Sequence, residues 1–241
     1  MKVEAVTFDF WNTLFRSDTA ATNRQRRDAF AAVFSARDVS IDMAVVDGVL
    51  AHVLEKHQQA WRDNRQFTAS HALDEALALL GDLCGTDARD ELAEAWLTAS
   101  RRADVEPTPG VGEVLEALSG DGVRVGIVCD VGLTPSVVLL EYLERHDLLR
   151  YFDHWSFSDD VGVYKPHPTI FRHALGGLGV DDPTRALHVG DLRRTDIAGA
   201  RQIGMTAVRY RGVSDDPPLD CDVEGDHVID DLRELLSLVG A

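Results

Sequence analysis

Four short segments of the sequence each bring a chemically active side chain to the end of an apolar run. They carry Asp9, Asp130, Lys165 and Asp191, and Asp196 follows the last of these by five residues. A carboxylate in such a place can attack phosphorus, a lysine can neutralise a phosphate, and paired acids can hold a divalent cation. Taken in order, the segments predict a site that transfers a phosphoryl group beside a metal ion.

The elements that must position these side chains alternate between strand and helix. Short runs with β-branched residues predict strands at 5–10, 124–129, 154–157, 186–189, 206–210 and 227–229. Apolar residues spaced by three and four predict helices at 111–118, 135–143, 169–178, 197–203 and 232–239. This alternation indicates an α/β fold with a doubly wound parallel sheet. Because ligands of such sheets gather at the carboxyl ends of the strands, we expect Asp9, Cys129 and Asp191 to converge there.

Residues 18–105 have a different pattern, with almost no strand signal. Stretches rich in Ala, Leu, Arg and Glu predict four helices, near 20–37, 42–63, 70–84 and 87–102. We therefore predict an α/β core domain of residues 1–17 and 106–241, and an inserted α-helical domain of residues 18–105. The links between the two domains are expected at 15–19 and 104–109.

The composition is typical of a globular protein. Its 241 residues, 45% of them hydrophobic, can bury a full core. The formal net charge of −17 disfavours binding to nucleic acid or to an anionic membrane, so we expect a small-molecule substrate. Three widely spaced cysteines (Cys84, Cys129 and Cys221) predict no disulfide framework. With no signal peptide and no apolar segment of about 20 residues, a cytoplasmic protein is expected.

The four segments, in this order and with Pro166 after Lys165, resemble the motifs of the haloacid dehalogenase (HAD) superfamily of hydrolases. The resemblance covers nearly the whole chain outside residues 17–105. It implies a Rossmann-like core and identifies the helical insertion as a cap domain, which in the family closes over the site, excludes water and selects substrates.

The resemblance also implies roles for single residues. Asp9 would be the nucleophile that forms an aspartyl-phosphate, Lys165 would neutralise the nucleophile and the phosphate, and Thr13 would support the loop after Asp9. A Mg²⁺ ion would be bound directly by the side chains of Asp9 and Asp191 and by the backbone carbonyl of Trp11. Asp196 would belong to the metal site as well, behind these direct ligands.

These residues also have ordinary structural alternatives. Asp9 and Thr13 could be turn residues, and Lys165 could be a solvated loop lysine. Asp196 could cap the helix predicted to begin at residue 197, and this role is compatible with a place near the metal.

Two positions depart from the family pattern. Trp11 stands where family phosphatases carry a second aspartate, which protonates the leaving group, and an indole is neither an acid nor a base at neutral pH. Cys129 stands where a serine or threonine binds the transferring phosphoryl group; a thiol is a weaker donor, and a small buried hydrophobe is the alternative. The turn after Asp130 could donate N–H groups instead, and Arg193 and Arg194 could bind the anionic part of the substrate.

The sequence thus predicts a Mg²⁺-dependent phosphatase of small phosphorylated metabolites with atypical acid–base chemistry. Three alternatives stay open. One is a haloacid dehalogenase, since those enzymes carry a tyrosine at the Trp11 position and use no metal, although they lack the acidic pair of Asp191 and Asp196. Another is cleavage of a C–P bond through an imine on Lys56. The third is a protein of this fold that binds a phosphorylated ligand without turnover.

Overall fold

The structure, a computed structural model, describes residues 2–81, 88–218 and 221–240. The chain forms two compact units. An α/β unit comprises Met1–Arg16, Glu106–Asp130 and Leu143–Ala241, and a helical unit comprises Ser17–Val105 and Val131–Tyr142. The second segment of the helical unit lies within the range that the sequence assigned to the α/β domain.

The α/β unit contains a six-stranded sheet in which every pair of neighbouring strands is parallel. Its strands are β1 (Ala5–Phe8), β4 (Arg124–Cys129), β5 (His154–Phe157), β6 (Ala186–Gly190), β7 (Thr206–Tyr210) and β8 (His227–Ile229). Their order across the sheet is β5-β4-β1-β6-β7-β8, so the chain starts in the middle and winds outward in both directions. This confirms the predicted doubly wound parallel sheet.

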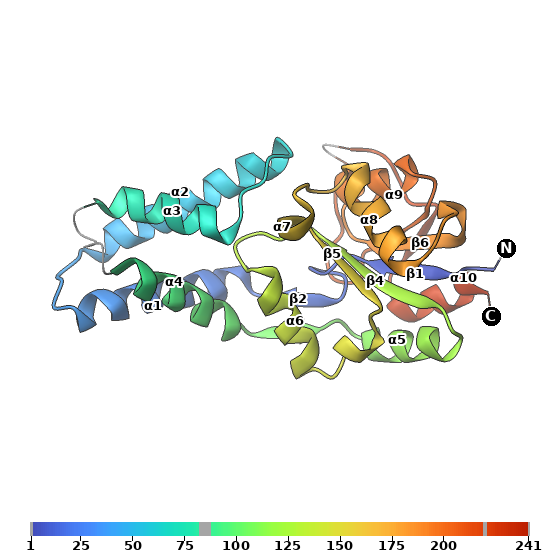
Figure 1. Ribbon diagram of the computed structural model, residues 1–241, viewed down its shortest axis with the longest axis horizontal. Coiled ribbons are helices and arrows are strands. Elements are labelled where there is room, and N and C mark those ends of the chain that lie inside the picture. The colour runs from blue at the N-terminus through green and yellow to red at the C-terminus, as the bar shows by residue number, and fades with distance from the viewer. Residues whose placement is uncertain (1, 82–87, 219–220, 241) are drawn as a thin grey trace. The chain divides into compact units, whose positions relative to one another are not determined.

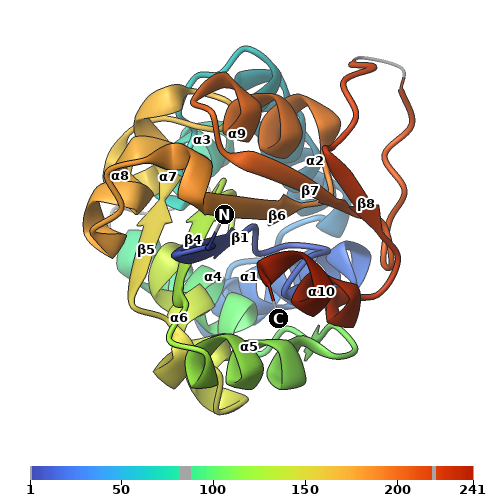
Figure 2. The same cartoon turned by 90° about the vertical axis from the view of Figure 1, so that its right-hand side faces the viewer.

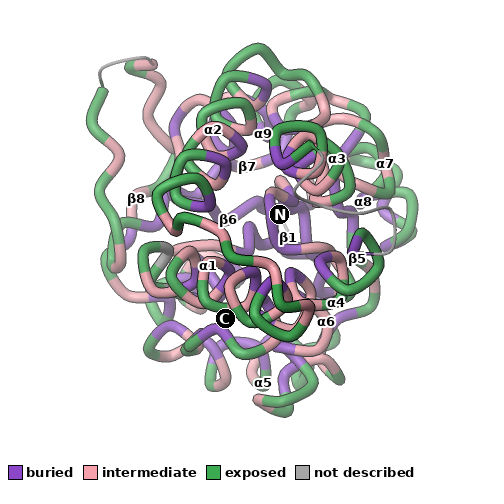
Figure 3. Tube along the Cα trace, turned by 90° about the vertical axis from the view of Figure 1, so that its left-hand side faces the viewer, coloured by how far each residue is buried: buried purple, intermediate pink, exposed green. Residues whose placement is uncertain are grey.

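Helices cover both faces of this sheet (Figure 2). One face carries α8 (Pro168–Leu178) and α9 (Ala198–Gln202), and the other carries α5 (Val111–Gly120) and α10 (Leu236–Val239). The shorter turns are η2 (Leu149–Tyr151), α7 (Ser158–Val161), η3 (Pro183–Arg185), η4 (Arg193–Ile197) and η5 (Leu232–Leu235). Because both faces are covered, the central strands β1 and β6 are buried along their whole length (Figure 3).

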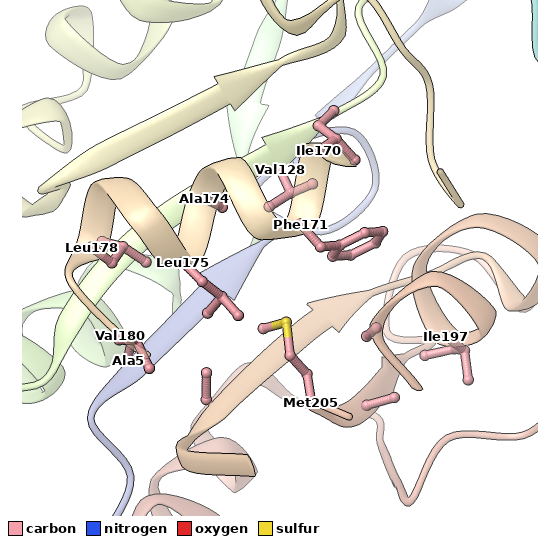
Figure 4. Packing of buried hydrophobic residues seen from close by; sticks show 13 residues of the cluster. Ala5, Val128, Ile170, Phe171, Ala174, Leu175, Leu178, Val180, Ile197 and Met205 are labelled. Atoms are coloured by element: carbon pink, nitrogen blue, oxygen red, sulfur yellow. The ribbon is translucent and has the colours of Figure 1, made fainter. Parts of the chain in front are cut away.

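An apolar cluster joins α8 to the sheet (Figure 4). Phe171 and Leu175 of α8 pack with Val128 of β4, Ala5 of β1 and Met205, the residue that precedes β7. The helix starts with Pro168 and ends at Leu178, and the next residue, Gly179, adopts a left-handed conformation with φ 65°. Lys165 lies three residues before α8, so this packing also holds the segment of Lys165 in place beside the sheet.

The helical unit contains α1 (Thr19–Ala36), α2 (Met43–Arg62), α3 (Ala69–Leu80), α4 (Ala88–Arg101) and most of α6 (Ser136–Arg145) (Figure 1). The side chains of Asp18, Asp42 and Thr68 cap the first three helices. The four helices predicted for 18–105 are present; the predicted end at Cys84 and start at Asp87 lie outside the described residues. Leu133, from the second segment of the unit, packs with Phe30 and Trp96.

Two short strands that the sequence did not predict, β2 (Phe15–Ser17) and β3 (Val105–Pro107), pair in a separate two-stranded sheet. They lie where the chain passes between the units, within or beside the links expected at 15–19 and 104–109. The two described cysteines, Cys129 and Cys221, are free, and Cys84 lies outside the described residues. Among the helices that the structure describes, none is long and apolar enough to cross a membrane.

Candidate active site

Asp9 lies at the carboxyl end of β1, in the middle of the sheet. Its N–H donates to Val189 O of β6 at 2.8 Å, so the strand pairing continues through the residue and fixes its direction. The turn that follows closes on Phe10, whose carbonyl accepts from the backbone N–H groups of Leu14 and Phe15. Only 6% of Asp9 is exposed. The carboxylate therefore emerges from a rigid strand end rather than from a mobile loop.

Lys165 is the cation of the site. It is 2% exposed, and its Nζ lies 2.5 Å from Asp9 Oδ1 and 2.6 Å from Asp196 Oδ1. Its backbone N–H donates to Asp130 Oδ1 at 2.7 Å, which ties the lysine to the end of β4. The alternative of a solvated loop lysine is wrong, because the ammonium is buried between carboxylates.

Asp196 is held by four donors. Oδ1 accepts from Lys165 Nζ and from His188 Nε2 at 3.0 Å, and Oδ2 accepts from Leu192 N at 3.1 Å and Thr195 Oγ1 at 3.2 Å. The residue sits inside η4, a turn of π-helix, and α9 starts after Ile197, so Asp196 is not the helix cap that the sequence offered as one role. With both oxygens engaged, it can orient Lys165 but has little capacity left for a metal ion.

Asp191 lies directly after β6, beside Asp9 on the neighbouring strand. Among the described residues, its only hydrogen-bond donor is Asn12 Nδ2, which is 3.3 Å from Oδ2. Asn12 adopts φ 60°, a left-handed conformation that asparagine tolerates, and this brings its amide to the acid. Asp9 Oδ2 likewise has no hydrogen-bond partner in the described part of the chain. Two buried carboxylates thus keep unshared lone pairs.

The electrostatics of the site follow from burial. Burial raises the pKa of Asp9 to about 7, although the Lys165 charge opposes this, and raises the pKa of Asp191 well above its ordinary value. Burial would also raise the pKa of Asp196, but the Lys165 charge and the His188 hydrogen bond outweigh it and lower this pKa. For Lys165, burial opposes but the Asp196 and Asp9 charges prevail, so its pKa lies well above the usual range.

This donor set suits a hard divalent cation. Asp9 and Asp191 offer carboxylate oxygens whose charges, when both are ionised, Lys165 alone would not balance. Mg²⁺ takes one or two carboxylates plus water and substrate oxygens. No cluster of three or more His, Cys, Asp and Glu side chains in the described ranges is arranged to hold a metal, which disfavours a fully protein-enclosed site such as structural zinc. The residues present therefore fit Mg²⁺ with an open coordination shell.

The two residues that depart from the family pattern flank this site. The Trp11 indole packs edge-on against Phe10, with ring centroids 5.0 Å apart, and brings no titratable group. Cys129 is fully buried at the end of β4, and burial together with the Asp9 charge raises the pKa of its thiol well above the usual value. Cys129 is therefore a neutral thiol, which excludes it as a thiolate nucleophile.

Thr13 is fully buried in the turn after Asp9. Its carbonyl accepts a hydrogen bond from Thr108 Oγ1 at 2.6 Å, whereas its own hydroxyl has no partner within the described residues. The backbone of Thr13 thus connects the Asp9 turn to the segment that precedes α5. This position agrees with a supporting role for the loop rather than with contact to substrate.

Three basic residues lie in settings that bear on their predicted roles. All three guanidinium nitrogens of Arg193 have partners between Asp216 and Glu224, which argues against its predicted substrate-binding role. Arg194 is partly buried, and its role stays a prediction. The side chain of Lys56 is 53% exposed and pairs with Glu75 at 3.5 Å, a setting that does not favour imine chemistry.

The structure also adds three polar residues that sequence reasoning did not select: Thr7, Asn12 and His188. For two of these residues the sequence does contain a recognisable feature. His188 is the one polar side chain inside the apolar run of β6, and Asn12 follows Asp9 within the same segment. Their partners, Asp196 and Asp191, could be identified only once the register of β1 and β6 was known.

The chain is similar to known proteins in sequence and in structure. Residues 3–204 match the family described as haloacid dehalogenase-like hydrolase. A glyceraldehyde 3-phosphate phosphatase of Methanopyrus kandleri is 32% identical over 98% of this chain and 97% of its own. A 2-haloacid dehalogenase of Pseudomonas syringae is similar in structure, with a TM-score of 0.72, 25% identity and 98% of both chains covered. The HAD-hydrolase YfnB of Bacillus subtilis, solved bound to magnesium, is 16% identical with a TM-score of 0.68 over the whole of both chains, which shows the shared fold.

Proposed function

This chain belongs to the haloacid dehalogenase-like hydrolases, and we propose that it is a Mg²⁺-dependent phosphatase of small phosphorylated metabolites with Asp9 as its nucleophile. The observation that carries the proposal is the arrangement around Asp9. One carboxylate oxygen is held by Lys165 at 2.5 Å, and the other has no protein partner among the described residues. The glyceraldehyde 3-phosphate phosphatase of M. kandleri supports a small phosphate ester as the substrate.

The residues of the site divide the reaction between them. The free oxygen of Asp9 attacks phosphorus and the P–O bond to the alcohol breaks, so that the alcohol leaves as an alkoxide and takes a proton from solvent water. A water molecule then hydrolyses the aspartyl-phosphate, which releases phosphate and restores Asp9. Lys165 compensates the charge of Asp9 and of the incoming phosphate, and Asp196 holds the lysine in place. Asp9 and Asp191 would hold the Mg²⁺ ion, which would supply countercharge for the phosphate when bound. Trp11 cannot protonate the leaving oxygen, so esters with good leaving groups are the better substrates.

The experiment is phosphate release from glyceraldehyde 3-phosphate, a wider panel of small phosphate esters and an aryl phosphate, with Mg²⁺ and with EDTA. We expect turnover that requires the metal and is lost in Asp9→Asn. The aryl phosphate is included because its leaving group needs little protonation. Absence of phosphate release from every ester, with and without metal, would refute the proposal.

A second candidate is hydrolysis of a carbon–halogen bond. The aromatic side chain at Trp11 and the structural similarity to the P. syringae dehalogenase favour it. The buried Asp191 disfavours it, because a second carboxylate beside Asp9 repels the anionic nucleophile unless a cation is bound. Halide release from 2-haloacids in the presence of EDTA would establish this alternative.

A further inference from the structure

His188 lies in the middle of the sheet and has no place in the reaction described above. It is fully buried, and its backbone is the register partner of Thr7 on β1. Its Nδ1 lies 2.9 Å from Thr7 Oγ1, and its Nε2 lies 3.0 Å from Asp196 Oδ1. The ring of Phe171 packs edge-on against the imidazole, with centroids 5.0 Å apart. Packing and two hydrogen bonds therefore define one orientation of the imidazole.

The partners of the imidazole determine which nitrogen carries the hydrogen. Asp196 Oδ1 is a carboxylate oxygen that offers only lone pairs, so His188 Nε2 must donate to it. Nδ1 of the neutral ring is then an acceptor, and it is the nearer acceptor for the one hydrogen of the Thr7 hydroxyl, because Thr7 Oγ1 lies 2.9 Å from Nδ1 and 3.3 Å from Leu187 O. In the opposite tautomer, two lone pairs would face each other in a buried place, which is costly.

These contacts form part of a continuous chain of side-chain hydrogen bonds. From Thr7 it passes through His188, Asp196 and Lys165 to Asp9, which lies two residues after Thr7 and directly after the last residue of β1. Side chains two residues apart on a strand point to the same face of the sheet. The side chains of Thr7 and Asp9, the two ends of this hydrogen-bonded chain, therefore lie on the same face of the sheet. Each hydrogen bond between them restricts the position of the Lys165 ammonium relative to the Asp9 carboxylate.

We propose that His188 is a positioning residue, which orients the Asp196 carboxylate so that Lys165 is held against the nucleophile. This inference rests on the proposed function of the site for its kinetic consequence. The competing explanation is that His188 only fills space in the core. The two explanations differ in whether the N–H donor or only the volume of the side chain matters.

A matched pair of variants separates them. Glutamine and methionine have similar size and shape, but only glutamine can donate a hydrogen bond toward Asp196. We expect His188→Met to lower kcat for an aryl phosphate by about ten- to a hundredfold, because a hydrogen bond to a charged group is lost. His188→Gln should recover most of this loss. His227→Leu, a change at an exposed histidine of β8, is the control and should leave kcat unchanged. Equal kcat values for the Gln and Met variants would overturn the proposal.

Two NMR measurements do not depend on turnover. In wild type, the ¹⁵N spectrum of His188 should show hydrogen on Nε2 and not on Nδ1. The chain has three lysines, and only Lys165 is buried, so its ammonium signal can be assigned. This signal should move or broaden in His188→Met and in Thr7→Val. The opposite tautomer, or an unchanged Lys165 signal in both variants, would refute the positioning role even if His188→Met folds poorly.

The outcomes for the site and for His188 are distinguishable. Absence of phosphate release by the wild type would refute the phosphatase, while the NMR spectra would still decide whether His188 orients Asp196 and Lys165. Conversely, a wild type that hydrolyses phosphate esters, together with a Met variant of unchanged kcat, would refute only the role of His188.

Discussion

Lys165 lies between two buried carboxylates, those of Asp9 and Asp196. Its ammonium contacts Asp9 at 2.5 Å and Asp196 at 2.6 Å, and all three side chains are less than one-tenth exposed. Removing one partner of a buried ion pair leaves the other charge uncompensated. The lysine is therefore expected to support the fold as well as the reaction.

We expect Lys165→Met to lower the free energy of unfolding of the metal-free protein by about 3 kcal/mol or more. Urea denaturation followed by circular dichroism measures this change. Lys56→Met is the control, because Lys56 is 53% exposed and such substitutions alter stability by about 0.5 kcal/mol at most. Similar losses in the two variants would contradict the view that the Lys165 cation balances buried charge.

Trp11 leads to a kinetic prediction at the same scale. An aspartate at this position would supply the missing acid, and general acid catalysis contributes about 10² to 10⁴ in rate. We expect Trp11→Asp to raise kcat for alkyl phosphates by about a hundredfold and to change kcat for an aryl phosphate far less. Steady-state rates for the two ester types give the comparison. A uniform change for both would mean that Trp11 acts through packing and not through the absence of an acid.

At the scale of elements, α1 is joined to the second segment of the helical unit by Arg26. This side chain is 4% exposed, and its Nη2 donates to Ser100 Oγ, Leu133 O and Thr134 Oγ1. Its guanidinium also lies 4.8 Å from the centre of the Trp96 ring. No carboxylate pairs with it among the residues that the structure describes. Hydrogen bonds and the aromatic ring thus compensate this buried charge only in part, since burial lowers the pKa of Arg26 to about 10 and its Nε has no partner among the described residues.

We expect Arg26→Met to lower the free energy of unfolding by about 2 to 4 kcal/mol, because several hydrogen bonds from a buried group are lost together. The neighbouring Arg27 offers a matched control, since it is more exposed and pairs with Asp47. Arg27→Met should cost about 1 kcal/mol or less. Thermal or urea denaturation of both variants tests the difference, and equal destabilisation would refute it.

The sequence predicted elements better than it predicted their partners. The helices of 18–105 and the six strands of the sheet follow from apolar periodicity, which is a local property. The three-residue strands β2 and β3 are too short to show a period. The helix at 135–143 was predicted, but its place in the helical unit depends on distant contacts such as Tyr142 Oη donating to Ser100 O.

The same limit applies to the site. Asp9, Lys165 and Asp191 could be selected because each follows an apolar run in a recognisable segment, and Asp196 because it lies five residues after Asp191. Arg193 was selected by proximity in sequence, but its side chain turns to the segment of Asp216 and Glu224. The sequence does not show which way a side chain points within a π-helical turn.

At the scale of the whole molecule, binding of a metal ion should couple to the stability of the fold. Burial raises the pKa of Asp9 to about 7, above its ordinary value near 3.8. The folded protein is therefore more stable when Asp9 is uncharged than when it is ionised. This contribution is complete below about pH 4 and is lost as the pH rises through about 7. Between about pH 6 and 8 the metal-free protein should lose about 1 kcal/mol from this group alone.

A cation bound to ionised Asp9 and Asp191 would offset this loss of stability, because its charge compensates the buried carboxylates. We therefore expect Mg²⁺ to raise the melting temperature more at about pH 8 than at about pH 6. Calorimetry at both pH values, with and without Mg²⁺, measures the difference. Asp191→Asn should reduce the increase at both values, whereas an equal increase in wild type and variant would show that the ion binds elsewhere.

The chain passes between the α/β unit and the helical unit four times, since each of the two helical segments, Ser17–Val105 and Val131–Tyr142, is left and entered once. An exchange of the helical unit with that of a relative by grafting 18–105 alone would leave 131–142 behind. The Leu133 carbonyl would then lose its donor, Trp96 Nε1, and the Tyr142 hydroxyl would lose its acceptor, Ser100 O. A chimera that preserves the packing within each unit must therefore exchange residues 17–105 and 131–142 together. Residues 131–142 should accordingly vary among relatives together with the helical unit and not with the sheet.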